Sequence, residues 1–223
     1  SYKPDTSLSL KPGPIISNFL AVVAEPQFYT YTFAGAVSFS ALFAYVSASP
    51  QVFMEIYHLS DKAYGWVFAF LSVGFIGSSQ VNSQLLKRFS SEQIVPVALT
   101  GQAITGLIFV LCAWGHWLSL PGIIALLFVF LCCLGCMNPN TSALSLALFS
   151  KNTGSASSLM GAIQMGIGSL ASTVVSLYNT HTALPMAVTM CGASLLALLI
   201  LLVCRRNIKT AVAAPSGGAP ALH

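Results

Sequence analysis

Long apolar segments alternate with short polar ones along almost the whole chain. Six segments are mostly apolar and long: Tyr29–Ser49, Ala63–Leu86, Ile94–Gly115, Leu120–Phe149, Gly154–Asn179 and Thr182–Cys204. A helix of roughly 20 apolar residues is long enough to cross the hydrocarbon core of a bilayer. The pattern therefore predicts an all-α integral membrane protein, a bundle of six transmembrane helices.

Two of these segments carry a proline close to their end. Pro50 follows a serine-rich stretch of the first segment, and Pro139 lies between two asparagines of the fourth. Proline has no backbone N–H and disfavours helical backbone before it, so we expect a helix break at each. The prolines, at positions 50 and 139, become equivalent if the spans form two inverted three-helix repeats. Paired interruptions of this kind are typical of a transporter site.

The fourth segment also carries polar side chains at helical spacing. Asn138, Thr141, Ser142 and Ser145 follow an i, i+3, i+4, i+7 pattern, which places them on one helix face. Such a stripe faces a cavity or a neighbouring helix, since hydroxyl and amide groups are costly in lipid. Hydrogen bonding that only holds the bundle together is the alternative. Gln164, near the middle of the fifth segment, is either a substrate-facing group or a packed one.

Small residues dominate one face of the fifth segment. Gly154, Ser158, Gly161, Gly168 and Ser172 recur at steps of four, three, seven and four and so share a face, and we expect close helix packing there.

The second segment ends in a polar cluster that begins near Gly77 and leads to Lys87 and Arg88. This cluster is either a helix end that meets water or a gating loop.

Charge is scarce and unevenly placed. Hydrophobic residues make up 56% of the 223 positions and charged residues only 6%, far below the share in soluble domains. With six spans, Lys62 alone falls on one side, and all these cations fall on the other: Lys3, Lys11, Lys87, Arg88, Lys151, Arg205, Arg206 and Lys209. The positive-inside rule then predicts two cytoplasmic termini. The net charge of +4 thus reflects topology, and we expect no nucleic-acid partner.

The ends of the chain differ from its middle. Residues 1–26 read as a cytoplasmic linker followed by a short amphipathic helix at the membrane interface, with Ile15, Phe19 and Val22 at helical spacing. Residues 27–206 form the predicted six-helix bundle. Residues 207–223 read as a disordered cytoplasmic tail.

The ionisable and nucleophilic residues do not suggest an enzyme. Histidines fall only in outer loops and in the tail, so no serine has an evident base within the membrane. Cys133 and Cys136 have CxxC spacing but no accompanying ligands, and we expect buried thiols rather than a metal site. None of the five carboxylates lies in the middle of a span, so the chain lacks an evident proton-coupling group of its own.

Four stretches carry a family resemblance. They are "LFAYVSASPQVF" at Leu42–Phe53, "LLKRF" at Leu85–Phe89, "MNPNTSALSLAL" at Met137–Leu148 and "GSASSLMGAIQMGIGSLAS" at Gly154–Ser172. Together they resemble the C-terminal half of a major facilitator superfamily transporter of the Bcr/CflA (bicyclomycin/chloramphenicol resistance) drug-efflux branch. The resemblance extends over roughly 14–206 and implies one half of a two-half transporter in the bacterial inner membrane.

The resemblance also implies site residues, partners and an energy source. Its members export amphipathic drugs in exchange for protons, so the proton gradient, rather than a bound cofactor, would drive transport. The coupling acids are expected in the N-terminal half, the partner that this chain lacks. The wall of the substrate cavity is expected to include Tyr45, Ser49, Asn138, Asn140, Thr141, Ser142 and Gln164. Gly77 and the run at Leu85–Phe89 would be a degenerate counterpart of the family's cytoplasmic loop motif.

Two other hypotheses fit the same sequence. One is a self-standing six-helix protein that homodimerises into a transporter or pore, and the other is a membrane scaffold without transport activity.

Overall fold

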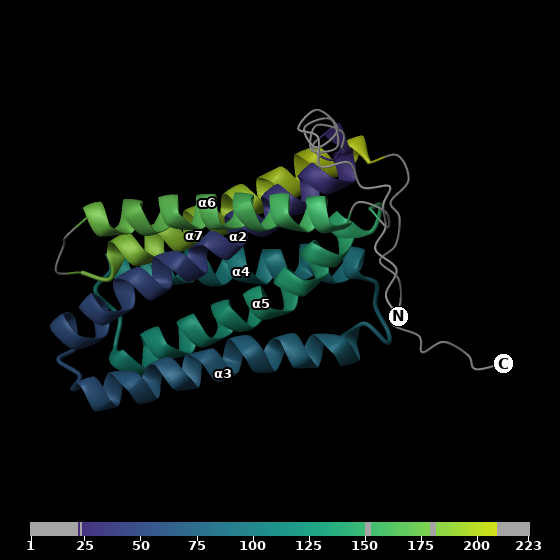
Figure 1. The fold of residues 1–223 in the computed structure, drawn as a ribbon. Coiled ribbons are helices and arrows are strands. Elements are labelled where there is room, and N and C mark those ends of the chain that lie inside the picture. Colours follow the sequence, from purple (N-terminus) through teal and green to yellow (C-terminus); the bar gives the residue numbers. More distant parts are fainter. Residues whose placement is uncertain (1–21, 23, 150–152, 179–181, 209–223) are drawn as a thin grey trace, which may run out of the picture.

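The computed structural model describes residues 22, 24–149, 153–178 and 182–208, which form a bundle of long helices (Figure 1). The helices are α2 (Pro26–Pro50), the π-helix η1 (Gln51–Ile56), α3 (Asp61–Leu85), α4 (Ser91–Trp114), α5 (Leu120–Leu146), α6 (Thr153–Leu177), α7 (Leu184–Cys204) and the 3₁₀ turn η2 (Arg205–Asn207). Within these residues, six helices are long and apolar enough to span a membrane, with α2 and η1 counted as one, and no strand occurs. The prediction of an all-α, six-span protein is confirmed.

The predicted linker lies outside the described residues, as do most of the interfacial helix and nearly all of the tail.

The helix starts follow local sequence signals. Ser60 accepts a hydrogen bond from the backbone N–H of Ala63 at the start of α3, and Ser119 does the same for Gly122 at the start of α5. Ser90 and Gln93 form a capping box on α4. The helices α2, α5 and α7 each carry a proline in their first turn, where the missing N–H costs no helical hydrogen bond.

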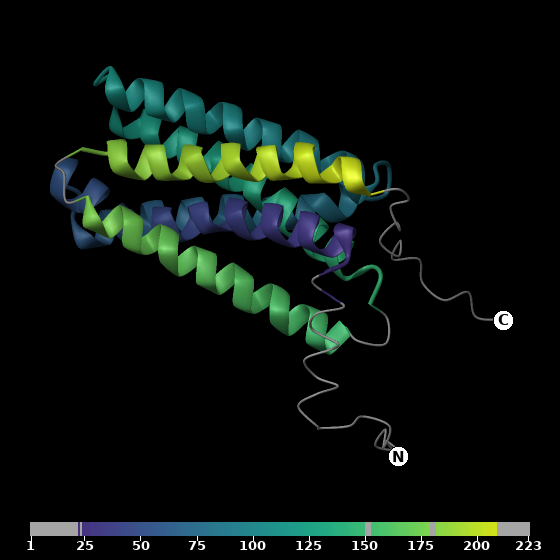
Figure 2. The same cartoon turned by 90° about the horizontal axis from the view of Figure 1, so that it is seen from above.

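Successive helices run in opposite directions, so the start of α2 and the end of α7 lie at the same end of the bundle (Figures 1 and 2). The turn after α3, with Lys87 and Arg88, and the end of α7, with Arg205 and Arg206, lie at this end. Lys62, at the start of α3, lies at the opposite end. The two ends are called here the arginine end and the Lys62 end.

The packing of the helices has the symmetry of two inverted repeats. The first helix of each triplet, α2 or α5, packs against the second and third helices of the other triplet. The remaining large contacts are α2 with α5 and α4 with α7, and both pairs are unchanged when the triplets are exchanged. Equivalent helices begin 94, 92 and 93 residues apart, at positions 26 and 120, 61 and 153, and 91 and 184. The three-plus-three arrangement predicted from the prolines is therefore present in the bundle.

The predicted helix break at Pro139 is not found, whereas at Pro50 the α-helix ends but the chain stays helical. The helix α5 continues through Pro139, and α2 passes at Pro50 directly into the π-helix η1. Pro50 leaves the carbonyl of Val46 without its usual N–H donor, and the hydroxyl of Ser49 donates to that oxygen at 3.2 Å. Side-chain donors and π-type turns are the means by which membrane helices accommodate proline. The prolines lie six and seven residues before the ends of their spans at 56 and 146.

The core is centred on α2 and α5, whereas α3 and α6 lie at the edges. In the most apolar window of the span formed by α2 and η1, 67% of the residues are buried, but the figure is 11% in both α3 and α6. Large side chains such as Phe53, Phe109 and Phe130 fill the centre. The helices α3 and α6 consequently keep most of their surface uncovered.

Candidate functional site

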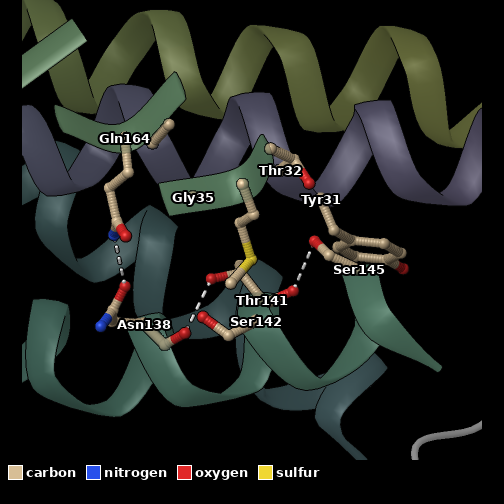
Figure 3. A pocket seen from close by; sticks show the side chains of 10 residues that line it. Tyr31, Thr32, Gly35, Asn138, Thr141, Ser142, Ser145 and Gln164 are labelled. Atoms are coloured by element: carbon tan, nitrogen blue, oxygen red, sulfur yellow. Dashed lines mark hydrogen bonds between the residues drawn. The ribbon is translucent and has the colours of Figure 1, made fainter. Parts of the chain in front are cut away.

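A small polar cleft lies between α2, α5 and α6 (Figure 3). It is lined by Tyr31, Thr32, Gly35, Ala36, Asn138, Thr141, Ser142, Ser145, Met160 and Gln164. Four of the predicted cavity residues are therefore brought together: Asn138, Thr141, Ser142 and Gln164. The enclosed volume is about 10 Å³, which is close to the space that one water molecule requires. In this arrangement the cleft is closed to a drug-sized molecule.

Two amide side chains connect α5 and α6 across the cleft. The Nε2 of Gln164 donates a hydrogen bond to the Oδ1 of Asn138, with 3.1 Å between the two atoms (Figure 3). Both side chains are only half-buried, so their remaining amide groups can reach the cleft. Each amide offers donors and acceptors without charge, which suits a ligand that forms hydrogen bonds.

Two hydroxyl groups of α5 at the cleft donate hydrogen bonds within their own helix. The Oγ1 of Thr141 donates to the carbonyl of Asn138 at 3.0 Å, and the Oγ of Ser145 donates to the carbonyl of Thr141 at 2.8 Å. Their lone pairs remain available as acceptors because a hydroxyl has one donor and two acceptor positions. On the facing helix, the Oγ1 of Thr32 is buried and has no hydrogen-bond partner among the described residues. The cleft is thus a neutral hydrogen-bonding site.

Gly35 explains how α2 and α5 can come so close at the cleft. A Cβ atom at this position would lie 2.8 Å from the Oγ1 of Thr141, which is closer than side-chain atoms tolerate. Neither Gly35 nor Thr32, which lies beside it in the cleft, was predicted from the sequence. Thr32 and Gly35 are three residues apart on the first span, which is the same helical spacing that identified the polar stripe on the fourth span. This spacing was the signal from which they could have been predicted.

Asn140 does not belong to the cleft. Its side chain is 1% exposed, and its Nδ2 donates to the Oδ1 of Asn82 on α3, 2.7 Å away. Two residues correspond to about 200° around a helix, so Asn140 and Asn138 point to opposite sides of α5. The prediction of a cavity role for Asn140 is corrected here to a buried contact between two helices.

Tyr45 and Ser49 also lie away from the cleft. The ring of Tyr45 stacks on Phe68 with 6.0 Å between the ring centroids. The hydroxyl of Ser49 lies 2.9 Å from that of Tyr64. Both residues are buried, and these contacts are made with side chains from the first half of α3. Their predicted place in the same cavity wall as Asn138 is therefore not found.

The small residues of α6 divide into two groups. A Cβ atom at Gly168 would lie 2.6 Å from the ring of Phe43, and the hydroxyl of Ser172 is hydrogen-bonded to that of Ser47. These two residues pack against α2. Gly154 and Gly161 have no heavy atom within 4 Å of such a Cβ. Ser158 is exposed, and its hydroxyl donates to the carbonyl of Ser155.

The predicted packing face is thus corrected. Within this chain α6 packs through Ala156, Gly168 and Val175, its buried residues, and not through Gly154, Ser158 or Gly161. These three lie on the uncovered side of the helix.

The residues of the predicted gating loop are not grouped together. Lys87 and Arg88 are exposed in the turn between α3 and α4. Gly77 lies ten residues earlier within α3, which corresponds to roughly 15 Å along the helix. A Cβ atom at Gly77 would meet open space.

Two of the three thiols of α5 face α3, while that of Cys133 lies beside Gly101 of α4. The Sγ of Cys132 and of Cys136 donate to the carbonyls of Gly74 and Ser78, both at 3.4 Å. Among the described residues, no group of three or more His, Cys, Asp or Glu is placed to hold a metal ion.

Comparison with known proteins identifies relatives. A model of the Major Facilitator Superfamily matches residues 2–174. The chain is 28% identical over 214 residues to a bicyclomycin resistance protein homolog of Haemophilus influenzae, an alignment that covers 94% of this chain and 53% of that protein. It is 22% identical over 178 residues to the uncharacterized MFS-type transporter YdgK of Bacillus subtilis, with 80% and 44% covered. The chain spans about half the length of these curated relatives.

Proposed function

Because the chain belongs to the major facilitator superfamily, we propose that it is the C-terminal half of a drug-efflux transporter of the bacterial inner membrane. The observation that carries this proposal is the neutral polar cleft between α2, α5 and α6, with Gln164 and Asn138 joined across it. The relative in Haemophilus influenzae, named for bicyclomycin resistance, supports drugs as the substrate class.

In the proposed transporter, the cleft orients the polar groups of a drug. Asn138 and Gln164 exchange their mutual hydrogen bond for bonds to the substrate, and Thr32 and Thr141 offer additional hydroxyl groups. Apolar contact area comes from the other half and from Tyr31 and Met160, which line the cleft. The cavity itself forms between the two halves, which agrees with the small volume enclosed by this half alone.

The uncovered side of α6 supports a second half as the partner. Its exposed positions include a stripe of small residues at steps of three and four: Gly154, Ser158, Ala162, Gly166, Ser169, Thr173 and Ser176. Small residues let the backbones of two membrane helices approach closely. The relatives are about twice as long as the region that matches this chain, so their remaining residues are enough for a second six-helix bundle.

Coupling to protons is assigned to the other half in this proposal. The residues lining the cleft include no carboxylate, histidine or lysine, so transport of a proton through this half has no evident carrier. The excess of cations at the arginine end supports an orientation with both termini in the cytoplasm.

A co-expression experiment tests the proposal. Cells producing this chain alone, the complementary N-terminal half alone, or both would be loaded with a fluorescent drug, and its retention would be followed after energisation. We expect energy-dependent export only when both halves are present. The variant Gly166→Leu should reduce export by blocking the stripe, while Gly65→Leu, also in open space but on α3, should not. Export by the single chain would instead support a homodimeric transporter.

A further inference from the structure

A second hollow, much larger than the polar cleft, lies between α6 and α7. Its volume is about 670 Å³, and its floor is formed by Val37 and Ser40 of α2. Both α6 and α7 pack against α2 but hardly against each other, and Figure 2 shows them diverging from their connection. The walls are largely aliphatic, with Leu170 and Val174 on one side and Val188 on the other. This hollow is called here the α6–α7 groove.

The groove begins at the Lys62 end and stops near the middle of the bundle. On α6 it extends from Tyr178 back to Ile167, and on α7 it extends from Leu184 to Leu196. At 1.5 Å per residue these segments are about 16 and 18 Å long. One leaflet of the hydrocarbon core is about 15 Å thick, so the groove has the depth of a single leaflet.

The mouth of the groove is more polar than its interior. Tyr178 and Thr182 line the mouth, at the level where a span meets the lipid headgroups. Tyrosine is enriched at this level of a membrane because its ring is apolar and its hydroxyl is hydrated. The exposed side chains of α7 beyond the groove are apolar, and they include Leu195, Leu199 and Leu202. The groove therefore opens on a face suited to lipid, whereas the small-residue stripe lies on another side of α6.

The shape of the groove indicates which kind of molecule can occupy it. The groove is about 16 Å long, its walls are largely aliphatic, and it opens on the lipid-suited face of α7. An extended hydrocarbon chain, which is a single file of methylene groups, fits. We propose that the α6–α7 groove binds one acyl chain of a phospholipid from the leaflet at the Lys62 end.

Gly192 keeps the groove open. It lies in the wall formed by α7, and a Cβ atom there would meet nothing within 4 Å. A larger side chain at this position would fill the groove without colliding with the rest of the protein. The variant Gly192→Leu should therefore exclude the acyl chain and leave the fold intact. Gly65→Leu on α3 is the matched control, because its Cβ also projects into open space but far from the groove.

The probe is phosphatidylglycerol with a photoreactive diazirine midway along one acyl chain. The protein would be reconstituted in nanodiscs containing this lipid and irradiated. It would then be digested, and the labelled residues would be identified by mass spectrometry. We expect labelling to concentrate on residues 167–178 and 184–196. Gly192→Leu should lower that labelling at least threefold, and Gly65→Leu should leave it unchanged. A thermal unfolding curve for each variant establishes that it is folded.

Three outcomes would overturn the proposal. Labelling spread evenly over the exposed faces of α4 and α7 would mean ordinary surrounding lipid. Groove residues left unlabelled by the lipid, together with disulfide-linked dimers of a Val188→Cys variant, would mean a protein occupant. Labelling in the groove that persists both in Gly192→Leu and in a second filling variant, Val188→Trp, would mean that the lipid does not enter it. Because the readout is lipid labelling rather than export, it is independent of the proposed transport activity.

Discussion

The side chain of Gln164 on α6 donates a hydrogen bond to the side chain of Asn138 on α5, with 3.1 Å between Nε2 and Oδ1. A hydrogen bond between two uncharged amides in an apolar bundle stabilises the helix pair only modestly, by about 1 kcal/mol. It can therefore be exchanged for bonds to a ligand at little cost. The pair connects a central helix to an edge helix that has few other contacts with α5.

A different pair of amides should serve stability alone. Asn140 and Asn82 are buried, and their hydrogen bond of 2.7 Å joins α5 to α3. We expect Asn140→Ala and Asn82→Ala each to lower the free energy of unfolding by about 1 kcal/mol, and the double variant to cost less than the sum. Unfolding in detergent measures this, with the exposed Ser83→Ala as control. Additive losses would contradict a direct bond.

The contact between α3 and α5 should be too close to accommodate even one additional methyl group. A Cβ atom at Gly135 would collide with the carbonyl oxygen of Phe75, which cannot move without shifting the backbone of α3. Gly135→Ala is therefore expected to lower the free energy of unfolding by about 1–3 kcal/mol. Gly161→Ala, where the same atom meets open space, should be neutral. Equal melting temperatures for the two variants would refute the close approach.

The hydroxyl of Ser49 should contribute to the stability of the protein because the next residue is Pro50. It donates to the carbonyl of Val46, which Pro50 deprives of its helical partner. Ser49→Ala should destabilise the protein by about 1 kcal/mol. The loss should shrink when Pro50→Ala restores the backbone N–H. Introducing Tyr64→Phe with and without Pro50→Ala removes the other hydrogen-bond partner of Ser49. The effect of Ser49→Ala that remains then comes from its bond to the carbonyl of Val46. A loss that is the same with and without Pro50 would argue against this role.

Cysteine labelling can determine the orientation of the protein in the membrane. Trp117 lies in the loop between α4 and α5 at the Lys62 end, and Phe89 lies in the turn at the arginine end. Both are more than half exposed. An impermeant thiol reagent added to intact cells should label Trp117→Cys but not Phe89→Cys, with the parent chain as background. The reverse pattern would invert the topology inferred from the cations.

The sequence predicted the spans well because continuous apolar stretches of membrane length have few other structural solutions. The inverted repeats followed from the paired prolines, although Pro139 does not break its helix and Pro50 only marks the change from α-helix to π-helix. Membrane helices recover the lost hydrogen bond locally, as Ser49 does. The cleft was found in part because Asn138 and Gln164 are polar groups in apolar surroundings.

The remaining misassignments depend on tertiary packing. The contacts Gly74–Cys132, Ser78–Cys136 and Asn82–Asn140 all join residues 58 positions apart, which defines a parallel register between α3 and α5. Nothing in a single sequence sets this register, so the burial of Asn140 against Asn82 was not foreseeable from it. The uncovered small residues of α6 had the spacing of a packing face, and only the bundle reveals that none of the described helices covers them.

The most direct test of the central claim is drug export by the chain co-expressed with its complementary half, with and without Asn138→Ala and Gln164→Ala. Loss of one hydrogen bond of about 1 kcal/mol corresponds to roughly a fivefold change. We predict at least that reduction in the export rate for each variant at unchanged protein level, and little change for Ser83→Ala. Export at the parental rate by folded Asn138→Ala and Gln164→Ala proteins would show that the cleft does not contact the substrate.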